Sequence, residues 1–372
     1  MASRMTNAKI LEIASHFALC GDVMAIKECH SGHINSTYFL TCKNGKSTKR
    51  YTMQIINTNV FKKPDEVMEN IVNVTGHIKD RLIAEGIDPE RRTLNVVYTT
   101  DGKWGYVDSD GKYWRFYDYI EDADNYNQVE STEMFEKVGF AFGHFQMQLK
   151  DFDASKLYET IPNFHNTEWR FDNLMDSMVA NRAGRVQSVL NELRFAIDRK
   201  EITSFINRGI ADGSLALRVT HNDTKLNNIM IDHETGEGVC VIDLDTVMPG
   251  SVLADFGDSI RFGASSAAED ETDLDRVYCR LDMFEAFAKG FIEGLEGSLS
   301  ESEIRALPMG AIILTYETGI RFLTDYLDGD TYFRIEYPGH NLDRARNQFK
   351  LVSDMESKLD EMNAIVEKYI SK

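Results

Sequence analysis

Five polar side chains of the kinds used in proton transfer and metal binding lie within one stretch of the chain. They are His221, Asp223, Asn228, Asp243 and Asp245. A carboxylate can accept the proton of a hydroxyl group, and carboxylate and amide oxygens are ligands that Mg²⁺ accepts from proteins. These residue types therefore fit a site at which a hydroxyl group reacts beside a bound metal ion.

The spacing of these residues narrows the chemistry to phosphoryl transfer. His221, Asp223 and Asn228 fit the pattern H-x-D-x-x-x-x-N, in which the Asp accepts the proton of the attacking hydroxyl group and the Asn binds Mg²⁺. A later Asp, here Asp243, binds the metal ion that bridges the nucleotide phosphates. The pattern predicts Asp223 as catalytic base, Asn228 and Asp243 as Mg²⁺ ligands, and ATP as co-substrate. A solvated polar loop is the alternative, which the joint spacing disfavours.

Two short apolar runs should bring the metal ligands together. Residues 229–231 and 239–242 lie on either side of a segment rich in turn-forming residues, which predicts a β-hairpin. Asn228 would precede the first strand and Asp243 would follow the second. Their side chains can therefore converge although they are distant along the chain.

Sequence blocks spread over nearly the whole chain point to a known family. They are ASHFAL, GHINSTY, VMENI, VTHNDTKLNN, VIDLDTVMPG, DFGDSIRFGAS, RFLTDYLDGDTYF and YPGHNL. These blocks resemble those of the aminoglycoside-phosphotransferase-type kinases, and within them the members that phosphorylate the anomeric C1 hydroxyl group of N-acetylhexosamines (GlcNAc and GalNAc). Kinases of aminoglycosides, choline or homoserine share the catalytic loop and are the alternatives.

The resemblance also implies contacts to the sugar. In addition to the catalytic Asp, which would itself bind the substrate hydroxyl group, these contacts are His33, Arg321 and Tyr332. Glu317, Arg321 and Asp325 are spaced by four residues and would share one face of a helix, so a row of ion pairs along that helix is the alternative role for Arg321.

Two residues would support the catalytic loop without touching the substrate. The family resemblance implies that an Asp in the segment after the hairpin braces the loop, and Asp255 is our choice. His221, the first residue of the motif, is expected to support the loop as well.

The N-terminal part of the chain has the pattern of a small antiparallel sheet crossed by one helix. The predicted strands cover residues 23–29, 36–42, 50–56, 93–99, 103–107 and 112–120. A first helix, capped by Thr6 or Asn7, should end at Gly21, and a second should run from Pro64 to Glu85. A sheet of five or six strands with one crossing helix is typical of the small lobe of a kinase.

Nucleotide contacts are expected from this lobe and from the segment that follows it. Gly32, in the turn of residues 30–35, would cover the phosphates with backbone amides. Tyr119 and Ile120 would lie at the hinge, where backbone groups bind adenine. Core packing is the alternative role for the aromatic residues in this region.

Gln54 departs from the kinase pattern. Protein kinases carry a Lys on the third strand that pairs with the phosphates and with a helix Glu. The loss of one charge about 4 Å from a phosphate removes on the order of 4 kcal/mol of attraction at an effective dielectric constant near 20. A second Mg²⁺, Arg50, Lys62 or Lys63 could replace the charge, and Glu66 or Glu69 could stand for the helix Glu. A non-catalytic, sugar-binding pseudokinase is the alternative.

From Ser131 onward the apolar spacing is helical almost to the end of the chain. Beyond a first helix starting there, the predicted helices cover residues 167–183, 186–207, 252–262, 274–293, 300–327 and 342–370. His144 and His165 have no metal-ligand spacing and are expected to be packed or surface side chains. The sequence thus predicts an α+β, protein-kinase-like fold with a sheet-containing N-lobe (residues 1–119) and a mostly helical C-lobe (residues 120–372).

Composition excludes several kinds of partner. The 372 residues suffice for two lobes, and a net charge of −19 argues against nucleic acid and anionic membranes as partners. The five cysteines form no C-x-x-C pair, which fits reduced thiols in a cytoplasmic protein. No signal-peptide core or apolar run of membrane-spanning length occurs. The expected partners are a small-molecule sugar and ATP; the oligomeric state stays open, with a monomer as one option.

Overall fold

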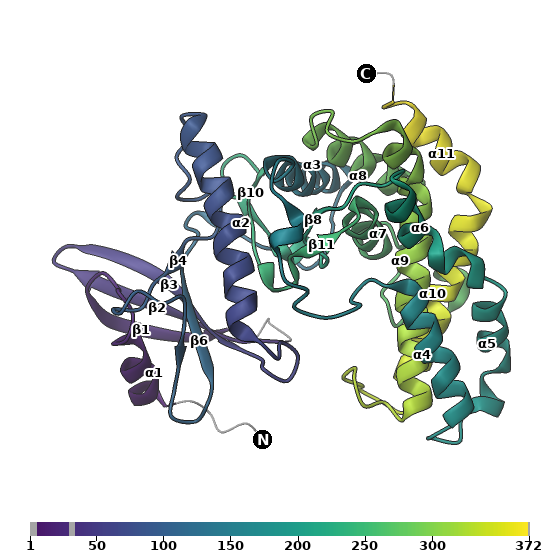
Figure 1. Ribbon diagram of the computed structural model, residues 1–372, viewed down its shortest axis with the longest axis horizontal. Coiled ribbons are helices and arrows are strands. Elements are labelled where there is room, and N and C mark those ends of the chain that lie inside the picture. The colour runs from purple at the N-terminus through teal and green to yellow at the C-terminus, as the bar shows by residue number, and fades with distance from the viewer. Residues whose placement is uncertain (1–5, 30–33, 371–372) are drawn as a thin grey trace.

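The small lobe is built on one antiparallel sheet, as the sequence predicts. The computed structural model describes residues 6–29 and 34–370 and shows this lobe at one end of the molecule (Figure 1). Within that part of the chain the sheet has six strands in the order β1-β2-β3-β6-β4, with β5 also paired to β6. The strands are β1 (Asp22–Cys29), β2 (Ser36–Asn44), β3 (Ser47–Ile56), β4 (Val96–Val97), β5 (Tyr106–Val107) and β6 (Tyr113–Asp118).

Two helices accompany the sheet. Helix α1 (Asn7–Ala14) is capped by Thr6, whose side chain accepts a hydrogen bond from the Lys9 amide. The predicted end of this helix at Gly21 is wrong, since the helix ends at Ala14. Phe17, three residues later, already forms an antiparallel β-bridge with Thr99. Helix α2 (Pro64–Ala84) has Pro64 in its first turn and matches the prediction.

Helix α2 connects the cores of the two lobes. Its apolar residues Val67, Ile71 and Val74 are fully buried and belong to the same hydrophobic cluster as the interior of the large lobe. Other buried residues of the sheet, such as Leu40 and Met53, form a separate cluster with α1. The helix therefore couples the sheet to the lobe that carries the predicted catalytic loop (residues 221–228).

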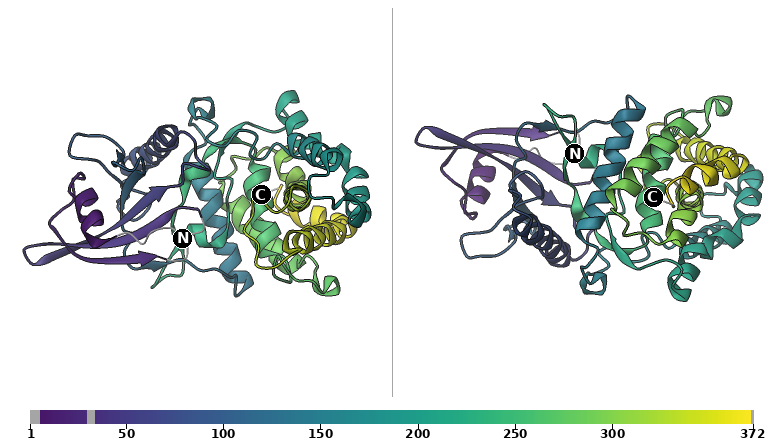
Figure 2. Two further views of the ribbon diagram at one scale, coloured as in Figure 1. Left: turned by 90° about the horizontal axis from the view of Figure 1, so that it is seen from below. Right: turned by 90° about the horizontal axis from the view of Figure 1, so that it is seen from above.

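The large lobe is mostly helical and carries short strands next to the small lobe (Figures 1 and 2). Its helices are α3 (Thr132–Gln148), α4 (Thr167–Ala180), α5 (Leu190–Ile197), α6 (Phe205–Asp212), α7 (Val252–Gly263), α8 (Leu281–Gly294), α9 (Glu301–Asp328), α10 (His340–Ser357) and α11 (Leu359–Glu367). Its strands are β7 (Ala123–Asp124), β8 (Arg218–Thr220), β9 (Ile229–Asp232), β10 (Gly238–Val241) and β11 (Met248–Gly250). The expected hairpin is β9 and β10, which pair antiparallel.

Three predicted helices have wrong limits. Residues 186–207 do not form one helix, because α5 is followed by a 3₁₀ segment (Lys200–Ser204) in which the Thr203 hydroxyl donates to the Lys200 carbonyl. Helix α8 begins only at Leu281, since the chain before it pairs Ser265 with Cys279 in an extended bridge. The helix predicted for residues 342–370 begins at His340 and is divided near Lys358 into α10 and α11.

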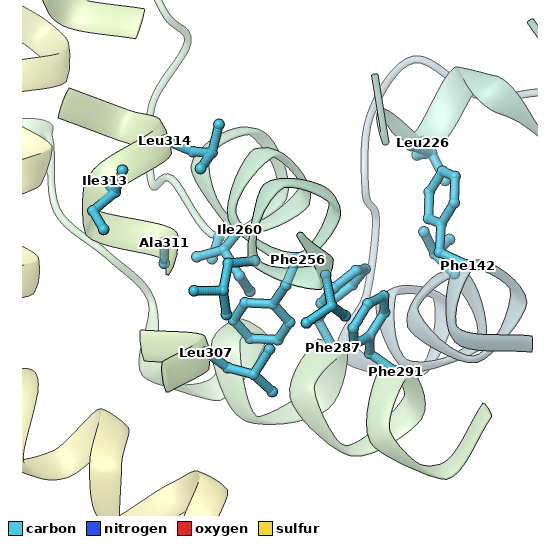
Figure 3. Close-up of a cluster of buried hydrophobic side chains, with 14 of the residues drawn as sticks. Phe142, Leu226, Phe256, Ile260, Phe287, Phe291, Leu307, Ala311, Ile313 and Leu314 are labelled. Atoms are coloured by element: carbon cyan, nitrogen blue, oxygen red, sulfur yellow. The ribbon is translucent and has the colours of Figure 1, made fainter. Parts of the chain in front are cut away.

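The core of the large lobe is packed around α7. Figure 3 shows Phe256 of α7 between Leu307 of α9 and the rings of Phe287 and Phe291 of α8. The Phe256 ring centre lies 5.6 Å from each of those two rings. Helix α7 is buried over nearly its whole length, so the residues that it carries are held in fixed positions beneath the catalytic loop.

Helices α3 and α8 touch through their backbones. Their contact is lined by Gly139, Gly143, Gly290 and Gly294. A Cβ atom at any of these positions would come within 1.9–2.5 Å of a backbone oxygen on the other helix. Only glycine therefore permits this close approach of α3 to α8. The contact fixes α3 on the core of the large lobe.

Substitution of Gly290 by Ala is expected to lower the free energy of unfolding by about 1–3 kcal/mol, because the new methyl group would meet the Glu136 carbonyl. Chemical denaturation of the purified variant measures this. The control is Gly76→Ala on α2, where a Cβ meets nothing within 4 Å and which should raise stability by up to ~1 kcal/mol. Equal effects of the two substitutions would contradict the close packing of α3 on α8.

Candidate active site

A cavity of about 450 Å³ lies between the two lobes. The small lobe and the segment after it contribute Gln54, Tyr119 and Ile120 to its wall, and the large lobe contributes Asp223, Asn228 and Asp243. Asp245 lines the cavity as well, so the structure brings together seven of the residues singled out in the sequence. Gly32 and His33 lie outside the described residues.

The catalytic loop is held from below by Asp255 on helix α7. The Asp255 carboxylate accepts hydrogen bonds from the backbone amides of His221 (2.9 Å) and Asn222 (2.7 Å) and from the Gln146 side chain (2.6 Å). Burial raises the pKa of Asp255, while these donors favour its ionised form. Asn222 has a backbone φ of 65°, a left-handed conformation that these bonds stabilise.

His221 joins the catalytic loop to the segment that precedes Asp243. Its Nδ1 accepts a hydrogen bond from the Asp223 amide at 3.3 Å, so Nε2 carries the proton donated to the Ile242 carbonyl at 2.9 Å. The ring is completely buried beside Phe142 and Phe145. Through these two hydrogen bonds His221 holds the segment before Asp243 next to Asp223.

Asn228 is oriented by the catalytic loop itself. Its Nδ2 donates to the Asp223 carbonyl (2.7 Å) and to the Asp223 carboxylate (3.1 Å). Both amide protons are directed to Asp223, so Oδ1 is the atom of this side chain that could coordinate a metal ion. Asp243 lies at the end of the hairpin with φ 58° and ψ 57°. An amide oxygen and a carboxylate thus face one cavity.

The Asp243 carboxyl group is in an electrostatically unfavourable position. Asp243 is exposed to solvent in the cavity, but desolvation by the surrounding protein raises the pKa of its carboxyl group. The carboxylates of Asp245 and Asp223 raise the pKa further and Arg115 and Lys225 lower it, which leaves a pKa of about 7. A cation beside Asp243 would favour the ionised form. Among the described residues no group of three or more His, Cys, Asp or Glu side chains could hold a metal ion. The oxygen donors of Asn228 and Asp243 instead fit Mg²⁺, which takes its other ligands from phosphates and water.

Lys225 belongs to the site and was not singled out from the sequence. Its ammonium group lies 2.6 Å from the Asp223 carboxylate. Burial lowers the pKa of Lys225, but Asp223 and Asp258 raise it by more, so the side chain stays charged. Its position two residues after Asp223, within the motif, was the signal that could have identified it.

Arg115 occupies the region where the strand lysine of protein kinases is missing. Gln54 on β3 is the register partner of Arg115 on β6, and the Arg115 Nε atom donates to the Gln54 Oε1 atom at 3.0 Å. The Arg115 guanidinium is paired with Asp245. A charged residue inside the buried strand YWRFYD needs a charged partner, and this was the sequence signal that could have singled out Arg115.

The replacements expected for the lysine lie elsewhere. Arg50 stacks on the Tyr119 ring, with 4.0 Å from its guanidinium carbon to the ring centre, and pairs with Glu121 near the hinge. Lys63 pairs with Glu66 at 2.8 Å on the exposed start of α2. Lys62 is exposed as well, and none of the three basic residues lines the cavity in the part of the chain that the structure describes.

Arg321 and Tyr332 lie outside this cavity, on a neighbouring cluster of aromatic and charged residues. The Arg321 guanidinium carbon is 5.6 Å from the ring centres of both Phe164 and Phe333. Tyr332 is 64% exposed and packs edge-on against Phe333. Arg321 has these rings as neighbours, so the row of ion pairs along α9 considered as its alternative role does not form.

Two acidic residues of that helix have other partners. Glu317 is bound to the His165 ring at 2.8 Å and to the Thr167 hydroxyl at 2.7 Å. Asp325 accepts the backbone amides of residues 331–333, which shapes the loop that carries Tyr332. His165 also contacts the Asn222 carbonyl at 3.1 Å, and this contact links the cluster to the catalytic loop.

Arg170 is a further member of the cluster that the sequence analysis did not identify. Two of its nitrogens donate to the Phe164 carbonyl, at 3.0 and 3.3 Å. Arg170 and Arg321 both contact Phe164, the first through its carbonyl group and the second over its ring. Burial and the charge of Arg321 lower the pKa of Arg170 to about 10. Nothing in the local sequence distinguishes Arg170 from a surface arginine.

The fold and the cavity define a kinase-like phosphotransferase: a small antiparallel-sheet lobe, a helical lobe, and a catalytic loop facing the cavity between them. The chain matches the phosphotransferase enzyme family over residues 25–289 and belongs to that family.

Solved structures with the same fold cover nearly the whole chain. An aminoglycoside phosphotransferase from Alicyclobacillus acidocaldarius subsp. acidocaldarius DSM 446 is 12% identical with a TM-score of 0.60, covering 99% of this chain and 98% of that one. Choline kinase from Cryptosporidium parvum Iowa II is also 12% identical with a TM-score of 0.60, covering 99% and 100%. A spectinomycin phosphotransferase bound to ADP and spectinomycin is 12% identical with a TM-score of 0.55, covering 96% and 100%. None of the described helices is long and apolar enough to cross a membrane.

The ion pair between His165 and Glu317 should make stability depend on pH. Burial lowers the pKa of His165, but the charge and hydrogen bond of Glu317, with the Asn222 carbonyl and Asp258, raise it by more, so the pKa in the folded protein is above its ordinary value. The charged pair therefore contributes fully below about pH 6.5 and its contribution is lost as the pH rises through the folded pKa. We expect His165→Gln to lower the free energy of unfolding by about 2 kcal/mol at pH 6 and by less at pH 9, measured by urea denaturation.

A matched histidine provides the control for that experiment. Burial lowers the pKa of His144, so its protonation opposes folding and the effect of His144→Gln should change with pH in the opposite direction. An effect of His165→Gln that is the same at both pH values would contradict the charged pair.

Proposed function

We propose that this protein transfers the γ-phosphoryl group of ATP to the anomeric C1 hydroxyl group of an N-acetylhexosamine, GlcNAc or GalNAc, to give the sugar 1-phosphate. The observation that carries the choice of acceptor is a pair of guanidinium groups at Phe164: Arg321 lies over the rings of Phe164 and Phe333, and Arg170 donates to the Phe164 carbonyl. His165, the next residue, contacts the catalytic loop at Asn222. We further propose that the boundary between the two lobes lies between residues 119 and 120, both of which line the cavity.

The arginine pair favours a neutral, oxygen-rich acceptor. A guanidinium group only donates hydrogen bonds, so it recognises hydroxyl and carbonyl oxygens such as those of an N-acetylated sugar. The faces of Phe164 and Phe333 offer apolar surface for the C–H side of a sugar ring. Two adjacent cations repel positively charged acceptors, and this disfavours the aminoglycoside and choline alternatives. The sequence block around Arg321 and Tyr332 supports the same assignment.

In the proposed reaction Asp223 accepts the proton of the C1 hydroxyl group as that oxygen attacks the γ-phosphorus, and the bond from the γ-phosphorus to the β,γ-bridging oxygen breaks, so that ADP leaves. Lys225 forms an ion pair with the Asp223 carboxylate and would hold it in orientation for this step. Asn228 and Asp243 would hold Mg²⁺, which when bound neutralises phosphate charge. Rate enhancement then comes from positioning and electrostatic stabilisation.

The remaining assignments complete the proposed site. Tyr119 and Ile120 would contact adenine at the hinge, and Gln54 lies on the wall facing the phosphates. Asp255 and His221 would hold the catalytic loop through the hydrogen bonds described above. Gly32 and His33 keep their expected roles towards the phosphates and the sugar.

The acceptor class is tested with a panel of substrates. We expect coupled ADP release with GlcNAc and GalNAc but not with choline, homoserine or an aminoglycoside, and ³¹P NMR should show a sugar 1-phosphate. Arg321→Ala should raise the KM for the sugar about 10- to 100-fold, because hydrogen bonds from a charged group are lost. Arg182→Ala, on the surface beside Asp328, is the control that should leave this KM unchanged. Turnover of choline in preference to the sugars would overturn the assignment.

The catalytic base is tested by Asp223→Asn. We expect kcat to fall by roughly 10²–10⁴-fold while the circular dichroism spectrum and the affinity for Mg·ADP are retained, because the amide cannot accept the hydroxyl proton. Asp110→Asn, in an exposed turn of the small lobe, serves as the matched control. Near-normal turnover by a folded Asp223→Asn variant contradicts the role, and Mg·ADP binding without any turnover of the wild type would favour the non-catalytic alternative.

A further inference from the structure

Strand β6 carries a guanidinium group that is almost completely buried at the boundary between the lobes. The Arg115 side chain is 1% exposed and its ion-pair partner, the Asp245 side chain, is 3% exposed. Asp245 lies two residues after Asp243, the proposed metal ligand, whereas Arg115 belongs to the small lobe. The ion pair therefore crosses from the sheet to the catalytic segment.

Asp245 also binds a second element of the small lobe. Its Oδ2 atom accepts a hydrogen bond from the Asn35 side chain at 2.6 Å, and the Asn35 Oδ1 atom accepts the Asn57 amide at 2.9 Å. Both carboxylate oxygens of Asp245 are thus bound to the small lobe, one by Asn35 and one by Arg115. This carboxylate therefore joins the catalytic segment to the sheet side of the small lobe, while Asn70 of α2 binds the Val247 carbonyl of the same segment at 3.0 Å.

Helix α2 does not supply a carboxylate to Arg115 where a kinase helix supplies one to its lysine. The α2 atom next to the guanidinium is the Met68 sulfur, 4.0 Å from Nη1. Glu66, one of the two candidates on this helix, is bound to Lys63 instead. The partner carboxylate comes from the other lobe.

We propose that the ion pair between Arg115 and Asp245 replaces the lysine–glutamate pair of protein kinases, and that Arg115 is a positioning residue for Mg·ATP. Because the usual pair lies within the small lobe and this one joins both lobes, it assembles only when the lobes are apposed. Arg115 would then set the position of Asp243 and the positive potential of the wall that faces the phosphates. The inference rests on the proposed use of ATP and is independent of the sugar.

Gln54 provides a direct way to separate this role from simple structural support. Gln54 lies 3.0 Å from Arg115, so a lysine at position 54 would place a charge near the same point from the neighbouring strand. Lys27 on β1 also lines the cavity and is exposed, and it is the competing source of positive charge. The two sources predict different results for single substitutions.

The experiment measures binding of Mg·ADP by calorimetry and the KM values for Mg·ATP and for the sugar. Arg115→Met and Asp245→Asn should each weaken Mg·ADP binding at least about tenfold and raise the KM for Mg·ATP, with the sugar KM within about twofold of the wild type. Adding Gln54→Lys to Arg115→Met should recover a large part of the lost nucleotide affinity. A purely structural role for Arg115 would not produce this recovery.

The control is Arg218→Met, which breaks the buried ion pair with Glu303 away from the cavity. It should lower the melting temperature without changing the affinity for Mg·ADP. Unchanged Mg·ADP affinity of Arg115→Met, no recovery by Gln54→Lys, or a loss seen only with Lys27→Met would overturn the inference. If Arg115→Met fails to fold, Asp245→Asn and Lys27→Met decide the question. A wild type that does not bind Mg·ADP contradicts the proposed function and the inference together, whereas a wild type that binds Mg·ADP but ignores N-acetylhexosamines contradicts only the proposed acceptor.

Discussion

The buried carboxylate of Asp255 is the interaction on which the arrangement of the candidate site depends. It binds two consecutive backbone amides of the catalytic loop, and one of them belongs to a residue with positive φ. Without an acceptor these amides would be buried and unsatisfied, which is costly in the lobe interior. The acceptor is fixed because α7 is packed on all sides, so the core of the large lobe determines where the Asp223 side chain points.

The polar contacts around this carboxylate form a continuous set. His221, in the catalytic loop, donates a hydrogen bond to the Ile242 carbonyl at the end of the hairpin. Asn228, at the start of the hairpin, donates to the Asp223 carbonyl. Asp245 then joins the hairpin end to the small lobe. These hydrogen bonds are 2.6–2.9 Å long and each has at least one buried partner, so breaking any one of them leaves a buried polar group unpaired.

Local patterns in the sequence were sufficient for a large part of the fold and for the centre of the site. The β9–β10 hairpin follows from two apolar runs around turn-forming residues, and the limits of α2 follow from Pro64 and Gly86. The spacing of Asp223, Asn228 and Asp243 placed them together, and in the structure they line one cavity. The roles of these residues stay predictions until the substitutions are made.

The features that the sequence did not reveal depend on contacts between distant segments. Arg115 and Asp245 are 130 residues apart, and their pairing requires the register of β3 on β6 as well as the apposition of the lobes. The partners of His165 are 57 and 152 residues away. The division of the helix predicted for residues 186–207 has a local cause instead, because the Thr203 hydroxyl bonds to the Lys200 carbonyl three residues earlier in the chain.

The left-handed backbone at Asp243 restricts which residue types can occupy that position. Asp and Asn adopt this conformation at lower cost than other residues with a side chain, and glycine adopts it most easily. Glutamate would retain the charge but disfavour the turn, and glycine would favour the turn but remove the ligand. Asparagine would favour the turn and keep an oxygen ligand but remove the negative charge. Aspartate combines the turn with a charged ligand, so the identity of this residue is determined as much by the shape of the main chain as by the ion that it would bind.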